Sequence, residues 1–174
     1  IQHSHLDIGY TDPQPRVLSQ HLDYLDAVLD LTAADDGFRW NVEANLPLTR
    51  WLSSRPAADR DAFLARVRER RIEVCALPFT MHTEAYSIDE LARTLRPAQA
   101  LRERHGIEIV TAMQTDVPGA AVGLCELLAA AGVRYLSVAH NYAGRSVPYL
   151  NGGQSLRRPF WWRAPSGRRL LVWH

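Results

Sequence analysis

The stretch IEIVTAMQTDVPGAAVGLCELLAAAGVRYLSVAH, residues 107–140, decides the fold class. Two apolar runs, 107–116 and 133–140, have the length and composition of buried strands. The segment between them opens with Pro118 and closes with Gly132, the residue types that often begin and end a helix. A strand, a helix and a second strand in this order connect two parallel strands, so the stretch predicts an α/β unit.

The rest of the chain alternates in the same way. Further strands are predicted at residues 1–7, 38–44 and 72–78, and helices at residues 17–29, 46–54 and 57–71. Ser87 and Glu90 form a capping box for a helix that runs to Arg104 and is interrupted near Pro97. Residues 159–174 predict a hairpin around a Pro-Ser-Gly turn. We therefore expect an α/β fold with a parallel sheet, open or closed as a barrel, and with helices outside.

Composition excludes several classes of protein. The net charge of +1 gives no electrostatic reason to expect nucleic acid as a partner, and no apolar run reaches the length of a membrane span. Cys75 and Cys125 lie within apolar runs, which favours buried free thiols over disulfides. We expect a cytoplasmic location. Because the chain begins inside a predicted strand and ends directly after an apolar run, we also expect it to be a segment of a longer protein.

Polar side chains recur where the predicted strands end. The carboxyl ends of parallel strands meet at one edge of a sheet, where α/β proteins bind their ligands. These residues are therefore expected to open onto a single cavity. They are His5, Asp7, Glu43, Asn45, His82, Glu84, Gln114, Asp116, His140, Asn141 and His174.

The first of these strand ends points to a metal. His3, His5 and Asp7 occupy alternate positions, so in an extended segment their side chains point the same way. Imidazole and carboxylate ligands together suit Zn²⁺, whereas a Mg²⁺ or Ca²⁺ site built from oxygen ligands would not need the histidine. His5, Asp7 and a third carboxylate therefore predict a zinc site.

A plainer interpretation exists for each residue taken alone. Asp and Asn after a strand often cap the next helix, and Asp116 directly before the segment VPG is well placed to do so. His21 and His105 fall on predicted helices and are interpreted as surface or packing residues. The whole set, with His-x-His-x-Asp at its start, favours the metal site over capping or solvation.

Four stretches together resemble glycoside hydrolase family 38, the α-mannosidases. They are HSHLDIGYT (3–11), FRWNVEANLPLTRWL (38–52), MQTDVPG (113–119) and PFWWRAPSGRRLLVWH (159–174), in the family's order. The sequence departs from the family where it has TDVPGAA after the fourth strand and ALPFTMHTEAY after the third. The resemblance is therefore to a divergent branch.

The resemblance implies an irregular, seven-stranded (β/α) barrel that is incomplete in this chain, and a single zinc ion. It assigns His5 and Asp7 as metal ligands and Asp116 as both metal ligand and nucleophile; His3 matches the motif's first histidine and is not assigned as a ligand. It implies retaining hydrolysis of α-mannosides or related glycosides, completed by domains further along the same polypeptide. Glu84 and Glu43 are the acid/base candidates within this chain.

Two other functions fit the same residues. A metal-dependent carbohydrate deacetylase or amidohydrolase can use a similar barrel, with the metal activating water and Asp116 acting as general base. A non-catalytic carbohydrate-binding fragment would keep the pocket and lack the acid.

Overall fold

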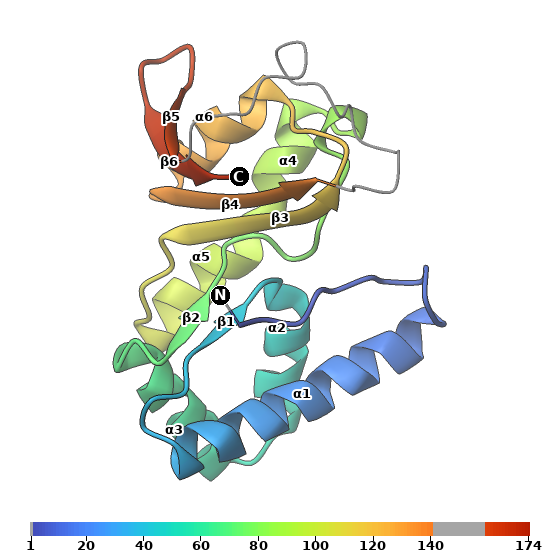
Figure 1. The fold of residues 1–174 in the computed structure, drawn as a ribbon, viewed down its shortest axis with the longest axis vertical. Coiled ribbons are helices and arrows are strands. Elements are labelled where there is room, and N and C mark those ends of the chain that lie inside the picture. Colours follow the sequence, from blue (N-terminus) through green and yellow to red (C-terminus); the bar gives the residue numbers. More distant parts are fainter. Residues whose placement is uncertain (1, 141–158) are drawn as a thin grey trace. The chain divides into compact units, whose positions relative to one another are not determined.

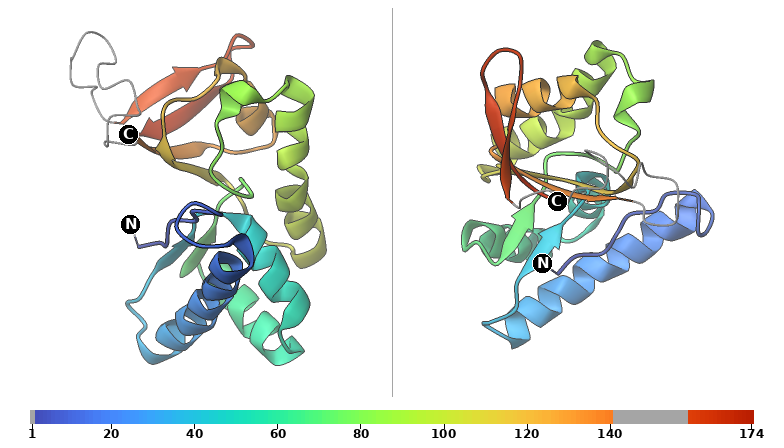
Figure 2. Two further views of the ribbon diagram at one scale, coloured as in Figure 1. Left: turned by 90° about the vertical axis from the view of Figure 1, so that its right-hand side faces the viewer. Right: turned by 45° about the horizontal axis from the view of Figure 1, so that its top comes forward.

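The structure, a computed structural model, describes residues 2–140 and 159–174. Figures 1 and 2 show the ribbon. The chain forms two compact units: unit 1 comprises residues 1–79 and 97–109, and unit 2 comprises residues 80–96 and 110–174. The units are described one at a time.

Unit 1 consists of helices around a short pair of parallel strands. Its elements are α1 (Gln14–Ala34), β1 (Trp40–Val42), α2 (Asn45–Ser54), α3 (Ala57–Arg68), β2 (Ile72–Val74) and all but the first residue of α5 (Arg96–His105). Strands β1 and β2 pair in parallel, with Trp40 opposite Ile72. Helix α1 packs against α2 and α3, and α3 also packs against β2.

The core of unit 1 contains two fully buried aromatic side chains, Trp51 of α2 and Phe63 of α3, whose ring centres are 4.9 Å apart. The indole N–H of Trp51 donates to Asp26 of α1 over 2.6 Å, and Arg55 donates to both oxygens of the same carboxylate. The polar edge of a buried tryptophan is thereby satisfied, which fixes α1 against α2.

Unit 2 contains a four-stranded sheet. Its elements are the 3₁₀ turn η1 (Thr83–Ala85), α4 (Ile88–Thr94), β3 (Thr111–Val117), α6 (Val122–Ala130), β4 (Tyr135–His140), β5 (Phe160–Arg163) and β6 (Arg169–Trp173). The strand order is β3-β4-β6-β5; β5 and β6 are antiparallel and the other pairs parallel. Helices α4 and α6 pack together and cover the same face of the sheet (Figure 2).

Several sequence predictions are confirmed. The β3–α6–β4 unit forms with parallel strands, and residues 160–173 form the expected hairpin. Both hydrogen bonds of the capping box are present: Ser87 N–H donates to the Glu90 carboxylate over 2.8 Å, and Glu90 N–H donates to Ser87 Oγ over 3.3 Å. The predicted interruption near Pro97 is also present, because α4 ends at Thr94 and α5 begins at Arg96.

The expected α/β fold with parallel strands is present, and over the described residues its sheets are open. β1 and β2 make a two-stranded sheet, and the four-stranded sheet has edges at β3 and β5, whereas a closed barrel needs every strand paired on both sides. One predicted strand is wrong. Residues 2–7 are extended but form no strand, although the Asn41 N–H donates to the Gln2 carbonyl over 2.9 Å. The predicted long loop 141–158, with Asn141, lies outside the described residues.

Within the described residues no helix has both the length and the apolar character needed to cross a membrane.

Candidate active site at the strand ends

The N-terminal segment keeps the alternation of faces that its sequence predicts. Leu6 is buried and packs with Val17 and Ala44, while His3 and His5 are only partly buried. Both imidazoles point to the same neighbour, the side chain of Glu43 just after β1. A segment without strand pairing therefore still presents its histidines on one side.

Glu43 joins the two histidines. Nδ1 of His3 lies 2.8 Å from Oε2 of Glu43, and Nδ1 of His5 lies 2.8 Å from Oε1. The Glu43 side chain is almost completely buried, at 1% relative exposure. A buried carboxylate is costly unless it is hydrogen-bonded, and here each oxygen has an imidazole partner.

The pKa of Glu43 reflects two opposing effects, its burial and its contacts with the two histidines. Burial alone raises the pKa of this carboxyl, but the hydrogen bonds from His3 and His5 and their charges outweigh burial and lower the pKa to about 2. Glu43 is therefore ionised at neutral pH. An ionised carboxylate only accepts hydrogen bonds, so the Nδ1 atom of each histidine carries the proton.

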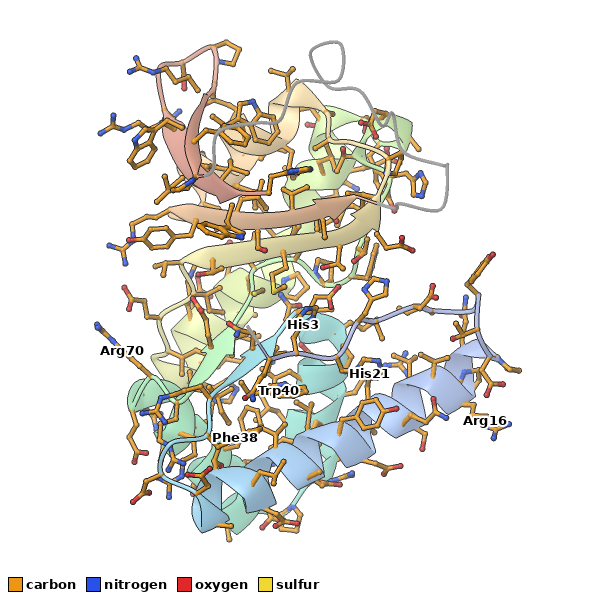
Figure 3. All side chains as sticks on the ribbon, in the orientation of Figure 1. His3, Arg16, His21, Phe38, Trp40 and Arg70 are labelled. Carbon is orange, nitrogen blue, oxygen red and sulfur yellow. The ribbon has the colours of Figure 1, made fainter. Side chains whose placement is uncertain are left out.

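His21 of α1 belongs to the same neighbourhood. Its side chain and that of Trp40, both labelled in Figure 3, line one small cavity. Burial lowers the pKa of His21, and a hydrogen bond to the His5 backbone works in the opposite direction. The cavity, of about 20 Å³ and lined in part by Ser4, His21 and Glu43, has room for one water molecule but not for a sugar.

Two of the predicted site residues have structural contacts. The amide of Asn45 donates to the carbonyls of Cys75 and Ala76, at 3.1 and 2.8 Å, and so links α2 to the chain after β2. The buried amide of Gln114 in β3 both accepts from the Met81 N–H and donates to the Met81 carbonyl. In unit 2 this pair of bonds fastens residues 80–82 to β3.

Asp116 has an unusual backbone. Thr115 pairs with Ala139 and Val117 with His140, so Asp116 is an extra residue that bulges from β3. Its φ of +60° lies in the left-handed region, which few residues other than glycine adopt. The side chain is exposed, and no hydrogen bond or ion pair to it occurs among the described residues.

The capping interpretation of Asp116 is wrong. Helix α6 begins at Val122 after the N-cap Ala121, and no side chain caps it. The N–H of Ala121 instead donates to Oγ1 of the buried Thr83 over 2.7 Å. The bulge thus turns a carboxylate toward solvent without a structural role for its oxygens.

Glu84, the next residue after Thr83, lies beside the same loop. A Cβ atom added at Gly119 would lie 3.7 Å from Oε1 of Glu84. Both Glu84 and Asp116 have exposed side chains in unit 2. The bond from Ala121 to Thr83 therefore places the neighbouring Glu84 beside the loop that follows Asp116.

The remaining predicted residues are more scattered. His82 is exposed in unit 2, His140 ends β4 and His174 follows β6. Asp7 lies in unit 1 with His5 and Glu43. Over residues 2–140 and 159–174, no three His, Cys, Asp or Glu side chains are arranged to hold a metal ion. The donor chemistry of His5 nevertheless suits zinc, since metal-binding histidines usually donate their other N–H to a carboxylate.

His21 is the residue that the sequence analysis missed. Its position was visible in the sequence, because it follows Val17 and Leu18 by four and three residues and precedes Leu25 by four. All three leucine and valine side chains are buried, so His21 falls on the inward stripe of α1. A histidine on that stripe next to a predicted strand was a candidate neighbour of the site.

A larger cavity of about 460 Å³ lies elsewhere in unit 1. Its lining residues come from α2, α3 and α5 and include Leu52, Arg60, Leu64 and Leu101. None of the candidate site residues is among them.

Solved structures share this fold at low sequence identity. An alpha-mannosidase from Enterococcus faecalis V583 matches with a TM-score of 0.77 and 16% identity, over 99% of this chain and 19% of that one. A glycosyl hydrolase family 38 protein from Enterococcus faecalis matches with a TM-score of 0.70 and 15% identity, over 99% and 18%. A 4-alpha-glucanotransferase from Thermococcus litoralis matches with a TM-score of 0.65 and 16% identity, over 99% and 26%.

The chain thus spans about a fifth of the length of the two Enterococcus structures. No curated protein sequence matches it. The family model for the glycosyl hydrolases family 38 N-terminal domain matches residues 1–174, the whole chain. This chain belongs to glycosyl hydrolase family 38 and matches its N-terminal domain.

Proposed function

We propose that the protein containing this chain is a zinc-dependent retaining glycoside hydrolase that acts on α-mannosides or related glycosides. Family membership supports a glycosidase, and one structure with this fold is named an alpha-mannosidase. The observation that carries the proposal is the conformation of Asp116: a strained, bulged backbone exposes a carboxylate that bonds nothing among the described residues. Backbone strain of this kind concentrates at functional sites.

In the proposed reaction Asp116 is the nucleophile. One of its oxygens forms a bond to the anomeric carbon while the bond from that carbon to the leaving oxygen breaks, and a carboxylic acid gives its proton to the leaving oxygen. The same acid, now a carboxylate, takes a proton from water, and the water oxygen displaces Asp116 from the sugar. Two inversions at one carbon give overall retention.

Glu84 is the acid/base candidate that its surroundings favour. Its side chain is exposed, and the bond from Ala121 to the neighbouring Thr83 places it beside the loop after Asp116. Glu43, the other candidate, is buried, has both oxygens bonded to histidines, and has a pKa of about 2. A general acid needs a pKa near the working pH, so Glu43 is poorly suited to that role.

We assign His5, Asp7 and Asp116 as the zinc ligands, as the family resemblance implies. When bound, zinc would grip sugar hydroxyls and stabilise negative charge on them. Around it, Glu43 would hold the His5 ring, and Asp116 would present its carboxylate to the sugar. Because the chain covers about a fifth of the related enzymes, we infer that later segments of the same polypeptide supply further site residues.

Trapping with an activated fluoroglycoside tests the proposal. The full-length protein should form a covalent glycosyl adduct, which peptide mass spectrometry should place on Asp116. The Asp116→Asn variant is the matched control and should take up no label. Release of acetate from an N-acetylated sugar without an adduct would favour the deacetylase, and sugar binding without turnover or adduct would favour a binding fragment.

A further inference from the structure

We infer that Glu43 is a positioning residue: it holds His3 and His5 in the tautomer that has the proton on Nδ1 and the lone pair on Nε2. The inference rests on the proposed function only where it concerns zinc. It replaces an acid/base role for Glu43 by control of its two histidine neighbours.

The contacts carry this inference. The two Nδ1 atoms lie 2.8 Å from different oxygens of one carboxylate, and that carboxylate is 1% exposed. A carboxylate accepts and does not donate, so both histidines must donate from Nδ1. A neutral imidazole has only one N–H, and its lone pair is then on Nε2.

The consequence differs for the two histidines. His5 is the proposed metal ligand, and an imidazole binds a metal through the nitrogen that carries no proton. Glu43 would thereby prepare Nε2 of His5 for binding before any metal arrives. His3 takes up the second oxygen of the carboxylate, so that the buried charge of Glu43 keeps a partner on each side.

The Glu43→Gln variant breaks this arrangement selectively. The glutamine side chain has one accepting oxygen and one donating NH₂ group, so it cannot accept from two histidines. One imidazole keeps its Nδ1 proton. The other faces the donating NH₂ group, which needs an unprotonated Nδ1, so its proton should move to Nε2. Removing His3 as well should leave the glutamine oxygen to His5 alone.

The first measurement is the tautomer of each histidine in the metal-free, full-length protein at neutral pH, by ¹⁵N NMR. In the wild-type chain, His3 and His5 should both show a protonated Nδ1. In Glu43→Gln at least one of them should show a protonated Nε2, and in the His3→Ala/Glu43→Gln double variant His5 should return to the wild-type pattern. Glu103→Gln, on the exposed face of α5 and bonded to Gln99, is the control for loss of one charge.

The second measurement is zinc affinity of the same four proteins by calorimetry. Loss of an outer partner of a metal ligand lowers affinity about 10–100-fold. Glu43→Gln should show such a loss, the double variant should recover most of it, and Glu103→Gln should match the wild type. Circular dichroism of each variant reports whether the fold is retained.

The outcomes separate the two proposals. A wild-type chain in which either histidine has its proton on Nε2 overturns the positioning role, and this needs no variant to fold. Unchanged tautomers in a folded Glu43→Gln chain overturn it as well. If the tautomers behave as expected but no protein binds zinc, the positioning role stands and the zinc assignment fails.

Discussion

Glu43 and Asp116 both follow strands, and their surroundings are opposite. Glu43 directly follows β1 in unit 1, is buried, and has a histidine bonded to each of its oxygens. Asp116 bulges from β3 in unit 2, has a left-handed backbone and is exposed. The first arrangement fixes a charge so that it can orient its neighbours, and the second leaves a charge available to react. The position of a carboxylate at a strand end therefore does not determine its role, whereas its contacts do.

The largest expected effect is the loss of activity in Asp116→Asn. A neutral amide cannot form the glycosyl ester, so kcat/KM for an aryl α-mannoside should fall by at least about 10⁴-fold in the full-length protein. Asparagine tolerates the left-handed backbone, so the melting temperature should stay at the wild-type value. A fully active variant would show that Asp116 is not the nucleophile, and the contrast between a reactive Asp116 and a structural Glu43 would then fail.

Glu43 should give the next largest effect, on stability in acid. Its folded pKa is about 2, below the usual 4.5, so its contribution to stability is complete above about pH 4.5 and is lost as pH falls toward 2. A pKa difference of this size corresponds to about 3 kcal/mol of unfolding free energy. Urea unfolding at a series of pH values measures it.

Two variants sharpen that measurement. Glu43→Gln should lose the part of the acid-dependent stability that Glu43 supplies, because it cannot ionise. A remainder should persist in the variant, since the pKa values of Asp26, Glu90 and Glu126 are also lowered. Asp116→Asn should keep the acid-dependent stability of the wild type, since the Asp116 carboxylate has no partner among the described residues. Equal acid slopes for the wild type and Glu43→Gln would mean that the two histidines do not stabilise the Glu43 charge.

Thr83→Val tests how the loop after Asp116 is held. The substitution keeps the shape of a buried side chain but removes the oxygen that accepts the Ala121 N–H. We expect a loss of about 1–2 kcal/mol in unfolding free energy, because the partly buried N–H of Ala121 is left without a partner. Thr83→Ser restores the hydroxyl and should recover most of this loss; chemical denaturation compares the three proteins.

The smallest expected effect is a gain in stability. Glycine adopts a positive φ without strain, so Asp116→Gly should gain about 0.5 kcal/mol after its entropic cost, while activity is lost. Arg70→Gly is a matched control, because Arg70 has a φ of +59° and lies in unit 1 with an exposed side chain. A similar rise in melting temperature for both, with activity lost only in Asp116→Gly, would show that strain is kept at Asp116 for function.

The sequence predicted local structure better than closure of the sheet. Pro118 and Gly132 placed the β3–α6–β4 unit, and Ser87 with Glu90 placed the start of α4, because these signals act within a few residues. Closure depends on pairing between distant strands, which no short pattern encodes. The alternation of residue types correctly predicted that His3 and His5 lie on one side of the segment and Leu6 on the other. Residues 2–7 nevertheless do not pair with another strand in the part of the chain that the structure describes.

For the candidate site, residue types could be predicted but not contacts. Both His5 and Glu43 could be singled out in the sequence. The sequence could not show that the Glu43 carboxylate bonds both His3 and His5, because these residues lie 40 and 38 positions from Glu43 in the chain and meet only when the chain is folded. The bulge at Asp116 arises from a register shift between β3 and β4, which the composition of neither strand reveals. Capping was the local explanation for Asp116, and a tertiary contact, Thr83 with Ala121, replaced it.

The division of the chain bears on how it folds during synthesis. Unit 1 takes its last helical segment, in α5, from residues 97–109, so its first 79 residues leave the ribosome without that segment. The side chains of Ala98 and Leu101, which are buried in the finished protein, arrive only later. Translation of the 30 residues from 80 to 109 takes roughly 2–6 s. For that time the nascent unit 1 is incomplete, and a chaperone that shields its exposed apolar surface would have to act within those seconds.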